Sequence, residues 1–198
     1  MYVRDAKNRE EVWLLDRLDQ LGIEDPAFRS RDYVISIDET SGEKAGFGRI
    51  RIHPGDPEVC ELAAVGVLPE WRDQGVGAHV IERLIAHAGD AGFDELYVVT
   101  DQIDYCTQLG FEPVSSDALS DPLAERLTEV RKNVSADAIV LTIEIDDFEM
   151  PDRLRERFKA AGRKDIEPES VDTSEADSLR EEFGIDPEAA TYKYDTGR

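Results

Sequence analysis

The stretch that most constrains this chain is residues 59–88, "VCELAAVGVLPEWRDQGVGAHVIERLIAHA". It begins with a near-continuous apolar run, which is typical of a central strand. It ends in a helical pattern, with apolar residues spaced by four from Val76 to Ala88. Gly75 and Gly77 stand where that helix should begin, although glycine inside a helix costs about 1 kcal/mol relative to alanine. The two glycines therefore indicate a special demand on the backbone at this turn.

A strand, a loop of small residues and a helix together form a binding site for anions. The amides of the first helical turn have no acceptor within the helix, and the helix dipole adds partial positive charge. Glycine lets a phosphate approach these amides, and Arg72 adds a fixed charge beside the loop. The chain lacks the Gly-Lys-Ser/Thr ending of a P-loop, and Val80 stands where a dinucleotide fingerprint needs a third glycine. The other interpretation is that the glycines only permit close packing on the strand.

The remaining periodicity predicts an α/β fold with a mixed sheet, because strands dominate early and helices interleave later. Residues 32–52 read as a hairpin. The strands are expected over residues 2–7, 32–38, 45–52, 59–68, 92–100, 111–114 and 136–145, and the helices over residues 8–22, 76–88, 103–110 and 120–133.

A change in composition near Met150 divides the chain into residues 1–149 and an acidic C-terminal extension, residues 150–198. The extension is expected to be mainly helical, with helices over residues 151–162 and 174–184 and a docked strand near the C-terminus. The apolar residues of the extension indicate that it packs against another protein surface. It could cover the first domain, mediate a homodimer or cross to a partner subunit, and the sequence leaves these open.

The charge is strongly negative, with 45 acidic and 23 basic residues and a formal net charge of -22. The carboxylates are spread along the chain, and arginine is preferred to lysine. This pattern resembles proteins adapted to molar salt inside extreme halophiles, where a Debye length of about 3 Å screens self-repulsion. An ordinary acidic protein is the other interpretation. Either way, nucleic-acid binding is disfavoured because it needs a basic face.

Several other classes of site and location are disfavoured. No stretch approaches the roughly 18 apolar residues that span a bilayer, and the N-terminal residues lack the apolar core of a signal peptide. We therefore expect a cytoplasmic protein with no membrane partner. Cys60 and Cys106 show no C-x-x-C spacing and are expected to be reduced thiols. The three histidines, His53, His79 and His87, share no ligand spacing, so no metal is expected.

The loop resembles the acetyl-CoA loop of the GNAT N-acetyltransferase superfamily, whose signature is Arg/Gln-x-x-Gly-x-Gly/Ala. Here it reads Arg72-Asp73-Gln74-Gly75-Val76-Gly77, after a lead-in "VGVLPEWR" that is similar to the family's Val-x-Pro-x-x-Arg. The stretch "YCTQLGFEPV" resembles the family's aromatic-Tyr-x-x-Leu-Gly-Phe ending. Residues 117–145 look like the helix-then-strand finish of the N-acetylglutamate-synthase-like branch. The resemblance covers roughly the first 147 residues.

The resemblance implies a GNAT-like mixed, mostly antiparallel central sheet flanked by helices. It also implies an acetyl-CoA-dependent N-acetyltransferase that moves an acetyl group directly to a primary amine, on a small molecule or amino acid rather than a protein. Two alternatives remain. One is a catalytically degenerate acyl-CoA-binding sensor or interaction module, and the weaker one is a nucleotide- or phosphate-binding protein that uses the same loop.

The resemblance also assigns the residues that would hold the cosubstrate. The end of the central strand, Val65, Gly66 and Val67, would pair with the pantetheine arm. The Val67 amide would hold the oxyanion. The pyrophosphate would be wrapped by the loop residues Arg72, Asp73, Gln74, Gly75, Val76, Gly77 and Ala78.

Glu61 is the candidate general base. It is the one carboxylate in the apolar strand, and the resemblance places it where several family members carry a catalytic glutamate. Partial desolvation is expected to raise its pKa and make it a better proton acceptor near neutral pH. The structural alternative is an ion pair with Arg49 or Arg51 on the neighbouring strand.

The leaving-group acid departs from the family pattern. The family usually has a tyrosine four residues before the glycine of Leu-Gly-Phe, and this chain has Cys106 there. Tyr105 is one residue earlier, which rotates its side chain by about 100° on a helix. Cys106 could assist, a local irregularity could bring Tyr105 round, or a thiolate of pKa near 8.5 could leave unassisted.

Four arginines lie where such folds often bind acceptors. Arg29, Arg31, Arg49 or Arg51 could hold the carboxylate of an amino acid such as glutamate. The alternative is that they only offset the local negative charge of a very acidic protein.

Overall fold

The computed structural model describes residues 1–164, so the helix expected over residues 174–184 and the strand expected near the C-terminus lie outside the described residues. The strands are β1 (Tyr2–Asp5), β2 (Tyr33–Ile37), β3 (Lys44–His53), β4 (Val59–Val67), β5 (Glu95–Thr100), β6 (Glu112–Pro113) and β7 (Ile139–Glu144). The helices are α1 (Glu11–Gln20), α2 (Val76–Asp90), α3 (Ile103–Thr107), α4 (Asp121–Asn133) and α5 (Asp152–Lys159). Each of these elements overlaps one that the sequence predicts.

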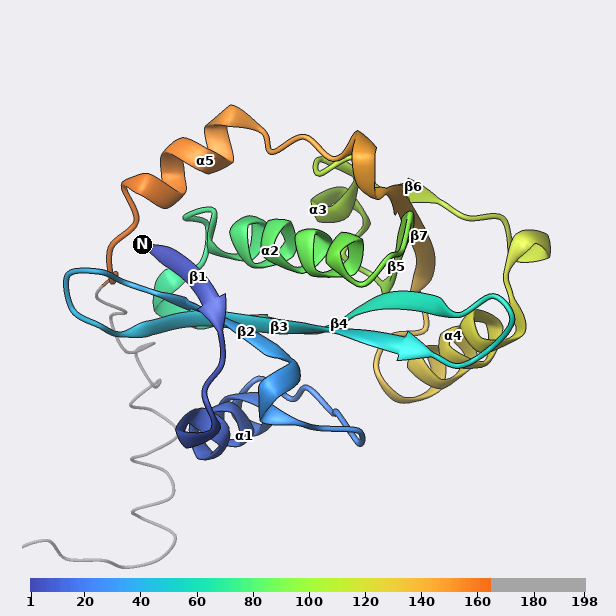
Figure 1. Cartoon of the computed structure of the whole chain (residues 1–198), viewed down its shortest axis with the longest axis horizontal. Helices are drawn as coiled ribbons and strands as arrows, with labels where there is room; N and C mark the ends of the chain where they lie inside the picture. Colours follow the sequence, from blue (N-terminus) through green and yellow to red (C-terminus); the bar gives the residue numbers. More distant parts are fainter. Residues whose placement is uncertain (165–198) are drawn as a thin grey trace, which may run out of the picture. The chain divides into compact units, whose positions relative to one another are not determined.

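The seven strands form one sheet in the order β1-β2-β3-β4-β5-β7-β6. Only the β4–β5 pair is parallel, and the other neighbours are antiparallel. This confirms the prediction of a mixed, mostly antiparallel sheet flanked by helices. The parallel pair lies at the centre of the sheet, with the connection through α2 between its two strands (Figure 1).

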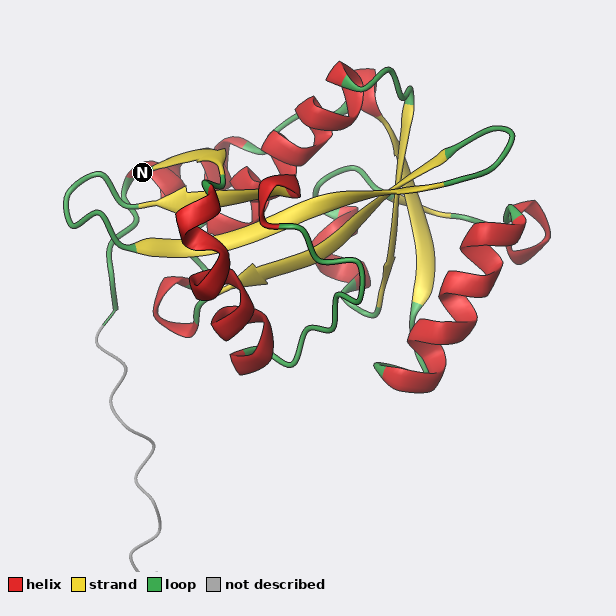
Figure 2. Cartoon of the chain, turned by 60° about the horizontal axis from the view of Figure 1, so that its bottom comes forward, coloured by secondary structure: helices red, strands yellow, loops and turns green. Residues whose placement is uncertain are grey.

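Helices cover both faces of the sheet (Figures 1 and 2). Helix α2 buries its apolar stripe, including Val80 and Leu84, on one face, together with α3. Helix α1 packs on the other face around Tyr33 and Phe47, and α4 packs on that face farther along through a cluster that includes Leu127. Successive residues of β5 alternate between the two faces. The sheet is therefore buried on both sides, which explains why β4 reads as an almost continuous apolar run.

A β-bulge distorts β4 before its end. Ala64 and Val65 of β4 stand opposite the single residue Gly48 of β3, and Ala64 has a φ of 51°. A bulge bends its strand and increases the local twist. The parallel pairing of β4 with β5 is confined to Glu61 and Leu62, and beyond these residues the two strands diverge. The spacing of apolar residues in β4 does not reveal this bulge.

The segment after β7 returns across the start of α2, as Figure 1 shows. Its helix α5 lies within the predicted residues 151–162 and buries Leu154 and Phe158. The Phe158 ring stacks on His79 of α2, with ring centroids 3.8 Å apart. Among residues 1–164, no helix has both the length and the apolar character needed to cross a membrane.

Candidate active site

A groove of about 680 Å³ opens where β4 and β5 diverge. Its walls combine the end of β4, the loop before α2, and α3. Val65, Gly66, Val67, Arg72, Asp73, Gly75 and Gly77 of the sequence-predicted site line it, together with Tyr105 and Cys106. The structure therefore brings most of the predicted cosubstrate residues to one cavity.

The loop at one end of this groove has the features of an anion site. Gly75 is the N-cap of α2, with a φ of 76° in the left-handed region that favours glycine. The backbone amides of Val76, Gly77 and Ala78 have no hydrogen-bond acceptor within residues 1–164. Free amides at the positive end of a 15-residue helix suit a phosphate ligand.

The glycines also meet demands from the protein itself. A Cβ atom on Gly75 would overlap the Leu154 carbonyl oxygen of α5, and one on Gly77 would lie 2.6 Å from the Tyr105 hydroxyl. The close approach of the α5 backbone therefore excludes a larger side chain at Gly75, whereas at Gly77 the Tyr105 side chain would have to shift. The sequence analysis explained the two glycines by the approach of a phosphate to the loop amides or by close packing on the strand. It did not predict the contacts with α5 and Tyr105.

The Val67 amide points into the groove. The Leu68 amide donates to the Ala45 carbonyl of β3 at 2.9 Å, and successive residues of a strand direct their N–H and C=O groups to opposite edges. The backbone groups of Val67 therefore face away from β3, toward the opening beside β5. The Arg72 side chain donates from Nε to the Val67 carbonyl at 3.3 Å, which links the anion loop to this part of β4.

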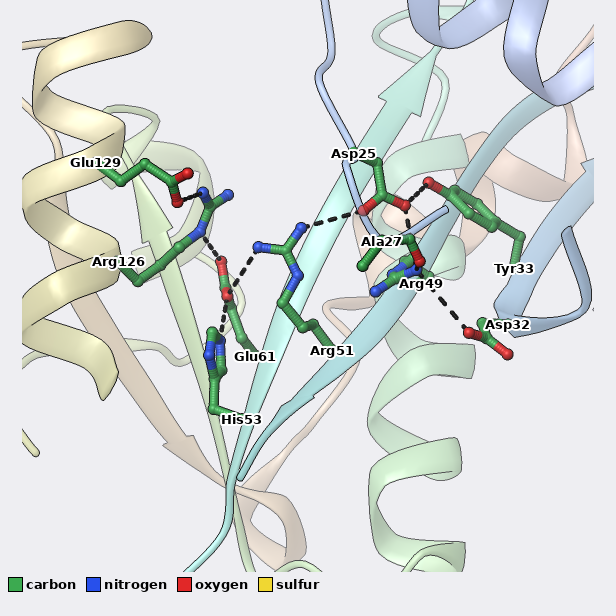
Figure 3. A network of polar contacts seen from close by, with 10 residues as sticks. All are labelled: Asp25, Ala27, Asp32, Tyr33, Arg49, Arg51, His53, Glu61, Arg126 and Glu129. Atoms are coloured by element: carbon green, nitrogen blue, oxygen red, sulfur yellow. Dashed lines mark hydrogen bonds and ion pairs between the residues drawn. The ribbon is translucent and has the colours of Figure 1, made fainter. Parts of the chain in front are cut away.

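Glu61 lies on the opposite face from α2, at the centre of a polar cluster (Figure 3). Its side chain is only 2% exposed. One carboxylate oxygen accepts from Nε2 of His53 at 2.6 Å and lies 3.8 Å from Arg51, and the other accepts from Nε of Arg126 at 3.1 Å. Arg126 also pairs with Glu129 on α4 at the surface. Glu61 therefore makes the predicted ion pair with Arg51.

The expected rise in the pKa of Glu61 is not found. Burial alone would raise it, but the hydrogen bond from His53 and the charges of Arg126 and Arg51 outweigh burial and hold the pKa of Glu61 below its ordinary value. The sequence-based expectation was wrong because it counted the apolar strand and missed two of these three partners. Glu61 is therefore a carboxylate at neutral pH.

The cluster continues through a second buried carboxylate (Figure 3). Asp25 is 3.1 Å from both Arg49 and Arg51, and it accepts from the Tyr33 hydroxyl at 2.7 Å. Burial and this carboxylate raise the pKa of Tyr33. Arg49 also donates to the Ala27 carbonyl, so it does not pair with Glu61, in contrast to Arg51. Each of these arginines offsets a specific buried charge.

A second cavity, of about 820 Å³, lies beside this cluster at the end of β3. Arg29, Arg31, Arg49, Arg51 and His53 all line it. Arg29 and Arg31 are exposed and form no ion pair within residues 1–164. The four arginines that the sequence analysis singled out therefore meet at one cavity, two of them paired and two of them open to a ligand.

Tyr105 and Cys106 differ in their surroundings. Cys106 is 5% exposed and packs in the core, where burial raises its pKa to about 11. Burial also raises the pKa of Tyr105. The Tyr105 hydroxyl lies beside Gly77 in the groove and has no hydrogen-bond partner within residues 1–164.

His53, Arg126 and Asp25 were absent from the sequence-based site. His53 could have been found, because Arg49, Arg51 and His53 alternate along one strand and so share a face. No pattern in the sequence relates Arg126 to Glu61, since 65 residues separate them.

The sequence profile of the GNAT acetyltransferase family matches residues 2–111. The chain belongs to this family. A mycothiol acetyltransferase of Thermobifida fusca is 29% identical over 108 residues, which are 48% of this chain and 33% of the relative. An amino-acid acetyltransferase of Escherichia coli K12 is 30% identical over 79 residues, which are 39% of this chain and 18% of the relative. The chain thus spans a third or less of the length of these curated relatives.

Solved structures confirm the fold. Rv2747 of Mycobacterium tuberculosis, determined in complex with CoA and NLQ, aligns with a TM-score of 0.61 at 16% identity, over 73% of this chain and 99% of that one. N-acetylglutamate synthase of Neisseria gonorrhoeae, complexed with coenzyme A and N-acetyl-glutamate, aligns with a TM-score of 0.56 at 20% identity, over 72% of this chain and 34% of that one. The predicted GNAT-like fold is correct, and the predicted branch is among the structural neighbours.

Proposed function

We propose that the protein is an acetyl-CoA-dependent N-acetyltransferase that transfers the acetyl group directly to the primary amine of an amino acid. The observation that carries this proposal is the groove, which combines free amides at the start of α2 with inward-facing backbone groups at the end of β4. Acetyl-CoA would supply the thioester, and both of these features suit it. The family and the CoA-bound structural neighbours support the same cosubstrate.

The orientation of the cosubstrate follows from the position of the anion loop. With the pyrophosphate on the amides of residues 73–78, the pantetheine arm would run back along β4, past Val67 toward Val65. The Val67 amide is the proposed oxyanion donor, and Val65, two residues along in the same direction, is the next amide that the thioester oxygen would reach. These donors belong to the backbone, so they need no specific side chain.

Glu61 is the proposed proton acceptor. The ammonium N–H bond breaks and its proton passes to the carboxylate, and the freed nitrogen lone pair attacks the thioester carbon. The C–S bond then breaks to release a thiolate, and a second N–H proton leaves the nitrogen and passes to this thiolate, which gives the neutral amide and the CoA thiol. Glu61 lies four residues before Val65 and six before Val67, about 13 Å and about 20 Å along the strand, so a chain of several water molecules would carry the proton. The lowered pKa keeps Glu61 ionised at neutral pH, but it also makes the carboxylate a weaker proton acceptor than a base whose pKa lies near 7.

An amino acid is the proposed acceptor because of the arginine-lined cavity. Arg29 and Arg31, which form no ion pair within residues 1–164, would bind an acceptor carboxylate bidentately, while Asp25 fixes Arg49 and Arg51. The N-acetyl-glutamate complex of the Neisseria enzyme supports this class of acceptor. The same reasoning disfavours polyamines, which carry no carboxylate.

The test is release of CoA from acetyl-CoA, followed by mass spectrometry in about 2 M KCl and in dilute buffer, since exposed charges are strongly screened in molar salt. The twenty amino acids, polyamines and short peptides are offered as separate pools. We expect turnover with the amino-acid pool and an increased KM for its acceptor in Arg29→Gln and Arg31→Gln. Turnover only with polyamines or peptides would contradict the acceptor class. No turnover in a folded protein that binds acetyl-CoA would favour the sensor.

A further inference from the structure

The segment of residues 150–164, here called the strap, lies outside the matched family region and contacts the anion loop and the residues just before it. Three contacts fix it there. The Gly162 amide donates to the Gln74 side chain at 2.9 Å, the Lys164 amide donates to the Glu70 carbonyl at 3.0 Å, and the α5 backbone packs on Gly75. The strap is therefore held directly against the loop that would bind phosphate.

The strap brings a cation to this loop. The Lys164 ammonium donates to the Arg72 carbonyl at 2.8 Å and lies 3.8 Å from the Asp73 carboxylate. Its side chain is 50% exposed, and the two residues it contacts, Arg72 and Asp73, line the groove. Among the described residues, Arg72 is the other cation of the loop. In a chain with a net charge of -22, a polyanionic ligand needs such local positive charge.

We propose that Lys164 of the strap binds a phosphate group of CoA and so completes the anion site. The proposal rests on the proposed function, because it assumes that CoA occupies the groove. The ammonium would exchange its weak contact with Asp73 for a charge-assisted hydrogen bond to a phosphate oxygen. The backbone contacts at Gly162 and Lys164 hold the strap in place before the ligand arrives, which lowers the ordering cost of binding.

The experiment measures dissociation constants of CoA, dephospho-CoA and pantetheine by calorimetry for the full chain and for Lys164→Gln. Lys159→Gln is the matched control, because it removes the same charge from an exposed position of α5. Lys164→Arg tests rescue by a second cation. We expect Lys164→Gln to weaken CoA binding about three- to tenfold, with unchanged pantetheine binding, an unaffected control, and restored affinity in Lys164→Arg.

Each result has a defined meaning. Weakening shared by CoA and dephospho-CoA supports a pyrophosphate contact, and weakening of CoA alone supports a 3′-phosphate contact. Unchanged CoA binding in Lys164→Gln overturns the proposal, and so does equal weakening of CoA and pantetheine, because pantetheine has no phosphate. A failure of the unmodified protein to bind any of the three ligands would instead contradict the proposed function.

Discussion

The groove and the polar cluster around Glu61 differ in the kind of protein group that forms them. The groove is formed largely by backbone groups, namely the β4 edge and the first amides of α2. The cluster is formed by side chains from β3, β4, α4 and the loop before β2. Backbone groups are positioned by local conformation, whereas the cluster depends on side chains from distant parts of the chain. The two regions should therefore respond differently to substitution and to pH.

The largest effect is expected from Glu61→Gln. Loss of a general base typically lowers turnover about 10²- to 10⁴-fold, and CoA affinity should stay unchanged because Glu61 does not line the groove. Turnover and CoA binding are measured on the same preparation. Glu129→Gln is the control, since it removes a carboxylate from the exposed end of the same cluster. Equal turnover in wild type and Glu61→Gln would leave Glu61 with a structural role only.

Substitution of Gly75 tests the groove, at the loop that begins α2. Gly75→Ala places a Cβ atom against the α5 backbone at a positive φ, so we expect α5 to shift and CoA binding to weaken about tenfold. Gly92→Ala is the matched control, because Gly92 has a φ of 89° beyond the other end of α2 and no neighbouring atom of residues 1–164 lies within 4 Å of a Cβ added there. It should cost about 1 kcal/mol of stability with unchanged CoA affinity. Similar loss of CoA affinity in both variants would contradict a specific role for the α5 contact.

Tyr105→Phe should have a smaller effect. The hydroxyl is positioned in the groove, but a thiolate is a fair leaving group without assistance. We expect turnover to fall less than about tenfold, at the low end of acid–base catalysis, and Cys106→Ala to leave the acid step unchanged because the thiol is buried in the core. Turnover is compared for acetyl-CoA and for a thioester with a more acidic thiol. If Tyr105 is the acid, the deficit of Tyr105→Phe shrinks with the second substrate.

The sequence predicted the groove better than the cluster for a physical reason. Gly75, Gly77 and the apolar strand before them express local conformation, which is readable over a few residues. The pair of Glu61 and Arg51 was also predictable, because side chains directly opposite on neighbouring strands interact.

The remaining contacts depend on tertiary packing. Arg126 reaches Glu61 only because α4 covers that face of the sheet, and Asp25 reaches two arginines from a loop. The bulge at Ala64 was missed because an alanine at positive φ carries no turn signal. These omissions explain the wrong expectation for the pKa of Glu61, which burial alone would raise and its unforeseen partners lower.

The smallest expected effect is on the pH dependence of the unfolding free energy. It distinguishes the polar cluster around Glu61 from the groove most directly. Because the folded pKa of Glu61 is below its unfolded value, its stabilisation is fully present above about pH 4.5 and is lost as the pH falls through the folded pKa. The difference in unfolding free energy between wild type and Glu61→Gln should therefore be largest near pH 7 and shrink in acid, by about 1.4 kcal/mol for each unit of pKa shift. The difference for Gly75→Ala should stay constant, because no titrating group is changed. Urea unfolding of the three proteins between pH 7 and pH 3 measures both differences, and a pH-independent deficit in Glu61→Gln would show that its ionised form contributes no stability.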